Sequence, residues 1–89
     1  MKYKLNDSII IEEVEDNQYL LYNTQFGTFA TINSIGKDIL DILQFDFVDF
    51  DQIEQNILKI YDVPESVIHD DIQVFLDSMN SKGFILYED

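Results

Sequence analysis

The chain has 89 residues, of which 46% are hydrophobic, and its formal net charge is −13, with five lysines and no arginine. This length indicates one domain over residues 1–89, and no apolar run approaches the roughly 18 residues that a membrane helix needs. The absence of cysteine excludes a disulfide framework, a thiolate nucleophile and a cysteine metal site. The acidity also argues against nucleic-acid binding, because phosphate contacts depend on cations.

The N-terminal residues do not predict a secretory signal. Two lysines stand among the first residues, but Asn6, Asp7 and Ser8 interrupt the apolar stretch that such a signal requires. We therefore expect a cytoplasmic protein. The acidity either keeps a small protein soluble or favours a partner that is locally basic or amphipathic, and composition leaves both interpretations open.

The first third of the chain predicts three antiparallel strands in a meander. Residues 9–14, 18–23 and 28–32 are rich in β-branched and aromatic side chains, which favour strands. Turn residues separate the first two segments, and Gly27 before the third can supply the positive φ of a tight connection. Because strands this short do not form a stable sheet alone, we expect helices on one face.

The apolar period changes at Asn33, where the first helix is predicted. Asn33 is a good N-cap, with Ser34 as the alternative, and the helix follows over residues 35–43. Its apolar residues recur at helical spacing. They are Ile35, Ile39, Ile42 and Leu43.

A second helix is predicted after the linker of residues 44–50. Asp51 or Asp49 would cap it, and it ends at Tyr61 because the residue before Pro64 disfavours helical geometry. Its apolar positions are Ile53, Ile57, Leu58 and Ile60.

A third helix is predicted from Pro64, which suits the first helical position, to a left-handed stop at Gly83. One stripe of this helix is apolar, at Ile68, Ile72, Phe75, Leu76 and Met79. The tail of residues 84–87 either adds a strand or packs on the core. This order predicts an α+β domain that is winged-helix-like, with a three-stranded antiparallel sheet followed by three helices.

Side chains that could carry catalysis or hold a metal are sparse. His69 is the only histidine, lies outside the apolar stripe and has no accompanying serine or cysteine motif. Asp46, Asp49, Asp51 and Glu54 lack the spacing of a calcium loop, so helix capping and solvation explain them. We therefore predict no catalytic residue, no metal site and no cofactor.

Three phenylalanines of the linker, Phe45, Phe47 and Phe50, stand among these acids. We expect them to fill the corner between the first two helices. The alternative is an exposed patch that docks another protein.

The third helix also carries a second strip beside its apolar stripe. At about 100° per residue, Val67, Asp71, Val74 and Ser78 share this strip. Either the core stripe is wide, or the strip lines one wall of a groove. The other wall would be the edge of strand 28–32, which has no proline, lysine or bulge to block pairing. A free strand edge beside a partly apolar helix is used for β-strand addition of a peptide.

Several short motifs occur in a set order over residues 19–85. They are Gly27 before a short strand, Ile32-Asn33 before a helix, Ile53-x-x-x-Ile57, Tyr61-Asp62-Val63 with Glu65, and Asp71-Ile72-x-x-Phe75-Leu76-x-x-Met79-x-x-x-Gly83-Phe84-Ile85. With this order and spacing, the chain resembles the PqqD family, the small leader-peptide recognition elements of ribosomal peptide natural-product pathways. It departs from the family where Gln44-Phe45-Asp46 stands in place of a frequent glycine, and where the Val63-Pro64 junction is one residue shorter than the common form.

The resemblance implies a winged-helix-like domain that binds the leader of a precursor peptide as an added strand. Family members deliver the complex to a modifying enzyme or a leader protease, in lasso-peptide or radical-SAM pathways. The implied peptide-binding residues are Thr28, Phe29, Ala30, Thr31 and Ile32 on the strand and Val67, Asp71, Val74, Phe75 and Ser78 on the helix. The implied partners are the leader peptide and that enzyme, without nucleic acid or membrane, for a protein that is a monomer or a weak homodimer.

Two other functions follow from the residues alone. Winged-helix folds occur in nucleic-acid-binding proteins, although fold does not determine function and the charge opposes this one. An acidic protein-interaction module, including a homodimer joined through the free strand edge, would use the same surfaces.

Overall fold

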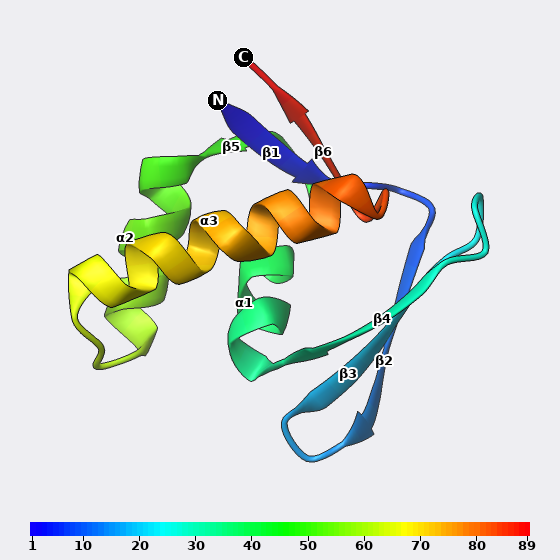
Figure 1. Cartoon of the computed structure of the whole chain (residues 1–89), viewed down its shortest axis with the longest axis horizontal. Coiled ribbons are helices and arrows are strands. Elements are labelled where there is room, and N and C mark those ends of the chain that lie inside the picture. Colours follow the sequence, from blue (N-terminus) through cyan, green and yellow to red (C-terminus); the bar gives the residue numbers. More distant parts are fainter.

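The computed structural model describes residues 1–89 and places three helices beside two three-stranded antiparallel sheets (Figure 1). The first sheet has the order β5 (Val48–Asp49), β1 (Lys2–Leu5), β6 (Ile85–Glu88), and the second has the order β2 (Ile9–Glu15), β3 (Gln18–Asn23), β4 (Phe29–Asn33). The helices are α1 (Ser34–Ile42), α2 (Phe50–Ile60) and α3 (Glu65–Ser81). The predicted α+β class, with a three-stranded meander followed by three helices, is confirmed.

The meander β2–β3–β4 follows the predicted segments closely. Gly27 has the expected positive φ of 71°, and β4 begins one residue later than predicted and extends to Asn33. The outer strand β2 is irregular, because its register with β3 shifts between Glu13 and Glu15. Three of the seven residues of β2 are glutamates, all of them exposed.

The second sheet was not expected from the sequence, which predicted no strand before residue 9. Lys2 pairs with Glu88 and Leu5 with Ile85, so the two ends of the chain run side by side (Figure 1). Tyr3 of β1 is buried in the core. Both predicted alternatives for the tail are therefore confirmed, because it adds a strand and also packs Phe84 and Ile85 into the core. Because β6 pairs with β1, the tail leaves the meander untouched.

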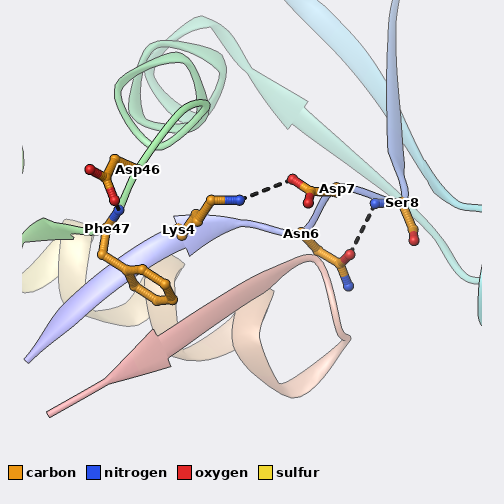
Figure 2. A network of polar contacts seen from close by, with 6 residues as sticks. All are labelled: Lys4, Asn6, Asp7, Ser8, Asp46 and Phe47. Atoms are coloured by element: carbon orange, nitrogen blue, oxygen red, sulfur yellow. Dashed lines mark hydrogen bonds and ion pairs between the residues drawn. The ribbon is translucent and has the colours of Figure 1, made fainter.

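A polar junction joins the two sheets at the turn between β1 and β2. The Ser8 amide donates to Asn6 Oδ1 at 3.0 Å, and Lys4 Nζ lies 2.9 Å from Asp7 Oδ1 (Figure 2). The Asn6 side chain also donates to the Gly83 carbonyl at 3.1 Å, and the fully buried Asn23 donates to the same carbonyl at 2.9 Å. The loop after α3 is thereby fixed to the β1–β2 turn and to the end of β3.

The helix ends agree with the predicted capping residues, with two adjustments. Asn33 caps α1 by accepting from the Gly36 amide, and Asp49, not Asp51, caps α2 in a reciprocal capping box with Gln52. Pro64 was expected as the first residue of α3 but is its N-cap, so the helix begins one residue later, at Glu65. Gly83 has the expected left-handed backbone, with a φ of 82°.

One hydrophobic core connects both sheets and all three helices. Its fully buried members include Leu21, Ile39, Leu40, Leu43, Ile53, Ile57, Ile72, Leu76, Phe84 and Ile85. Each such side chain contributes about 1.5–3 kcal/mol of burial free energy. Ile60 is an exception to the predicted stripe of α2, because it is 59% exposed at the last helical turn.

The linker phenylalanines do not act as a unit. Phe50 packs against the core, and its ring centroid lies 4.8 Å from that of His69 on α3, so filling of the corner between the first two helices stays a prediction for this residue. Phe47 is half-buried, and its amide donates to Asp46 Oδ1 (Figure 2). The expectation is wrong for Phe45, which is 85% exposed because the turn after α1 directs it away from the core.

Candidate functional site

The edge of β4 that faces away from β3 is unpaired. β4 is the last strand in the order β2–β3–β4, and no strand of the other sheet pairs with it. The predicted free edge is therefore present. The strand also lacks the devices that usually block an edge, because it contains no proline, lysine or bulge.

The hydrogen-bond pattern identifies which residues of β4 face this open edge. The Asn23 amide of β3 donates to the Thr28 carbonyl, whereas the Thr24 amide donates to Ser8 on the β2 side. Because these directions alternate along an antiparallel strand, the register pairs Leu21 with Ala30 and Tyr19 with Ile32 through ladder bonds. The N–H and C=O groups of Phe29 and Thr31 consequently point outward, toward the open edge.

A cleft of about 430 Å³ lies between α1 and α3, where β4 ends. Six of its ten lining residues are hydrophobic, and the full lining is Asn33, Ile35, Gly36, Ile39, Ile68, Asp71, Ile72, Val74, Phe75 and Ser78. The predicted Asp71, Val74, Phe75 and Ser78 thus come together on one wall. Val67 is 52% exposed and lies outside the lining.

Gly36 allows α1, α3 and β4 to meet closely at the inner end of this cleft. A Cβ atom at this position would lie 2.9 Å from Phe75 Cε1 and 3.1 Å from Ile32 Cβ, which is closer than side chains normally pack. The absence of a side chain therefore permits the Phe75 ring to lie against the first turn of α1. This contact sets the separation of β4 and α3 at one end.

Contacts between the β3–β4 loop and the end of α3 set that separation at the other end. Thr28 Oγ1 donates to the Lys82 carbonyl at 3.4 Å. The Phe26 ring lies 3.0 Å from the position that a Cβ of Gly83 would take. Between this pair of contacts and the Gly36–Phe75 contact, the outward groups of Phe29 and Thr31 have no partner strand.

The side chains of the strand residues divide between its two faces. Ile32 is buried and Ala30 is half-buried, so both point toward the core. Phe29 and Thr31 are exposed on the opposite face, where the Phe29 ring lies 4.6 Å from that of Tyr22. Thr28 precedes the strand. α1 also contributes to the cleft, at Ile35, Gly36 and Ile39 together with its cap Asn33, and no pattern in the sequence predicted this.

His69 lies away from this cleft, at a contact between α2 and α3. Its Nδ1 atom is 3.1 Å from Oε2 of the buried Glu54, and this hydrogen bond is the main reason that the pKa of His69 is raised above 6.5. No group of three or more His, Asp or Glu side chains is placed to hold a metal ion. None of the helices is both long and apolar enough to cross a bilayer.

Residues 18–85 match the family model described as "Coenzyme PQQ synthesis protein D (PqqD)". The chain belongs to the PqqD family. The resemblance inferred from the motifs is thus confirmed, and this PqqD-family protein matches no curated protein.

Two solved structures share the fold of this PqqD-family protein. "TbiB1 in Complex with the TbiA(beta) Leader Peptide" is 22% identical with a TM-score of 0.76, and the match covers 97% of this chain and 99% of that one. "Lasso peptide synthetase B1 complexed with the leader peptide" is 19% identical with a TM-score of 0.71, over 98% and 100% of the respective chains. The likeness therefore extends over nearly the whole length of both chains in each comparison.

Proposed function

We propose that this PqqD-family protein is a non-catalytic recognition domain, formed by residues 1–89, that binds the leader of a precursor peptide as an added strand. The leader pairs with the open edge of β4 and lies against α3. The domain then presents the leader to a modifying enzyme or a leader protease in the cytoplasm.

The observation that carries this proposal is the open edge of β4 beside the cleft between α1 and α3. In strand addition, main-chain hydrogen bonds supply affinity and side-chain pockets supply selectivity. The outward groups of Phe29 and Thr31 supply the first, and the mostly apolar lining at Val74, Phe75 and Ile72 supplies the second. The two similar structures, whose names describe complexes with leader peptides, support the same assignment.

A proline substitution at Thr31 tests strand addition with little effect on the fold. The Thr31 amide faces the open edge, so Thr31→Pro removes a donor from the proposed ladder without removing one from the β3–β4 ladder. We expect the affinity for a leader peptide to fall at least about tenfold, because one hydrogen bond is lost and the proline ring clashes with the added strand. Isothermal titration calorimetry measures this change, and circular dichroism checks the fold.

Two further variants serve as controls. Thr31→Val keeps the amide and the β-branched shape, so its affinity should remain within about twofold of the original. Ala30→Pro removes an amide that bonds to β3, so it should lower the stability of the protein itself. Unchanged leader affinity in a folded Thr31→Pro variant would contradict strand addition at this edge.

A further inference from the structure

Asp71 is the only charged residue in the lining of the α1–α3 cleft. Its side chain is exposed, and its carboxylate forms no hydrogen bond or ion pair within the protein. The lysine nearest to the cleft along the chain, Lys37, is already paired with Asp41. A full negative charge thus stands unpaired beside an apolar surface that could cover a peptide side chain.

Few positively charged groups of the protein lie near Asp71 and could neutralise its carboxylate. α3 itself has no lysine or arginine, and Glu65, Asp70 and Asp77 lie on the same helix. The N-terminal end of α1 also opens on the cleft, but it contributes only about half a positive charge, part of which Asn33 already satisfies. The balance at Asp71 therefore favours a cation from outside the chain.

We propose that Asp71 is a subsite for a lysine or arginine of the bound peptide, next to an apolar peptide residue that enters the cleft. This inference rests on the proposed function and adds a chemical class to it: a leader segment that carries an apolar and a basic residue in close succession. A carboxylate and an arginine or lysine form a charge-assisted hydrogen bond, which is stronger than a neutral one.

The arrangement of β4 and α3 predicts where the basic residue lies in the peptide. β4 runs from the contact between Thr28 and Lys82 to the surroundings of Gly36, where Ile32 and Phe75 both lie close. Asp71 is one helical turn beyond Phe75, about 6 Å farther along α3. At about 3.3 Å per strand residue, the basic residue should lie roughly two to four residues from the peptide position opposite Thr31, on the side toward Ile32 and beyond the paired segment.

Selection from a displayed library of random peptides tests the subsite without knowledge of the natural leader. The library is selected against the full-length protein and against Asp71→Asn, Asp71→Lys and Asp70→Asn. The last is the matched control, because Asp70 is an exposed neighbour on α3 that does not line the cleft. We expect the original protein and Asp70→Asn to enrich lysine or arginine at one position, Asp71→Asn to lose this preference, and Asp71→Lys to select acids there.

A selected peptide then gives the size and origin of the effect. Asp71→Asn should weaken its binding about fivefold at low salt, as expected for a partly exposed ion pair. Added salt should reduce this difference, because it screens exposed charges. The affinity of the same peptide for Thr31→Pro is measured as well. This variant tests strand addition, whereas Asp71→Asn tests the basic subsite.

The outcomes separate the two proposals. Peptides that require the Thr31 amide but keep their basic preference on Asp71→Asn, or show no basic preference, would overturn the subsite and leave strand addition standing. Failure to enrich any peptide, or enrichment that Thr31→Pro does not affect, would overturn the proposed function and the subsite with it.

Discussion

Gly36 has the strictest steric requirement in the cleft. It lies in the first turn of α1 and is buried, and a Cβ atom there would crowd both the ring of Phe75 and the Cβ of Ile32. Alanine would favour the helix by about 1 kcal/mol relative to glycine, but overpacking a filled site costs about 1–3 kcal/mol. The second effect is larger here because Ile32 belongs to a paired strand and cannot move far.

Gly36→Ala should therefore lower the free energy of unfolding by about 1 kcal/mol and weaken leader binding, because the Phe75 ring must shift into the cleft. Urea denaturation gives the first quantity and calorimetry the second. In the double variant with Phe75→Leu, the smaller side chain should relieve the crowding, so the combined loss should be less than the sum of the single losses. Strict additivity would show that Phe75 is not displaced.

The pair formed by His69 and Glu54 determines how stability depends on pH near neutrality. The hydrogen bond from Glu54 raises the pKa of His69, desolvation lowers it, and the charges of Glu54, Asp70 and Asp51 raise it further. Since the folded pKa exceeds the unfolded value of 6.5, this contribution is complete below that pH and is lost as the pH rises through the folded pKa.

We expect unfolding by urea to occur at lower concentration at about pH 8 than at about pH 6, because neutral His69 no longer compensates the buried carboxylate of Glu54. His69→Gln removes the titrating group, so the free energy of unfolding should change less between these two pH values. An unchanged pH dependence in the variant would assign the effect to other groups. Since Glu54 and His69 lie outside the cleft, peptide affinity should not follow the same profile.

Individual positions differ in how far the sequence could predict them. The periodicity of α3 correctly brought Asp71, Val74 and Ser78 to one strip, because helical spacing alone decides which residues share a face. Whether that strip faces a cleft depends on α1, which no local pattern specifies. Phe45 and Phe50 differ for the same reason: both are aromatic, and only the direction of the turn after α1 buries one and exposes the other.

Among the elements, the meander and the helices were predictable and the sheet formed by the chain ends was not. Strands β2, β3 and β4 are joined by short turns whose residues indicate the pairing. β1 and β6 are each four residues long and pair across almost the whole chain, at Lys2 with Glu88. Such a distant pairing leaves no local signal beyond a few β-forming residues, and β5 is only two residues long.

The cap of α2 gives a prediction at the level of a single helix. Asp49→Ala should lower the unfolding free energy by about 1 kcal/mol, because it removes the acceptor for the Gln52 amide. Asp51→Ala is the matched control in the first turn, where only the interaction with the helix dipole is lost, at about 0.3–0.5 kcal/mol. Equal losses in thermal denaturation would contradict Asp49 as the cap.

The molecule as a whole carries far more negative than positive charge. Only three ion pairs are formed, one of which involves His69, so most of the 18 acidic side chains repel one another without compensation. This excess opposes contact with nucleic acids and favours a locally basic peptide. It also weakens the folded state, in which the acids are closest together.

Added salt should accordingly stabilise the protein. Raising sodium chloride from about 10 mM to about 300 mM shortens the screening length severalfold, and we expect the Tm to rise by about 5 °C. Differential scanning calorimetry measures this shift. A Tm that falls or stays constant would mean that attractive pairs outweigh the repulsion.

The meander has two outer strands, and they are not equivalent. Three exposed glutamates and a register shift make β2 unsuited to pairing with another chain, whereas β4 has neither. A peptide can therefore pair with the meander only at β4. A second copy of the protein finds no suitable edge at β2. The expected stoichiometry is one leader per chain, and occupation of β4 would at the same time close the one outer strand of the meander on which copies of the protein could pair.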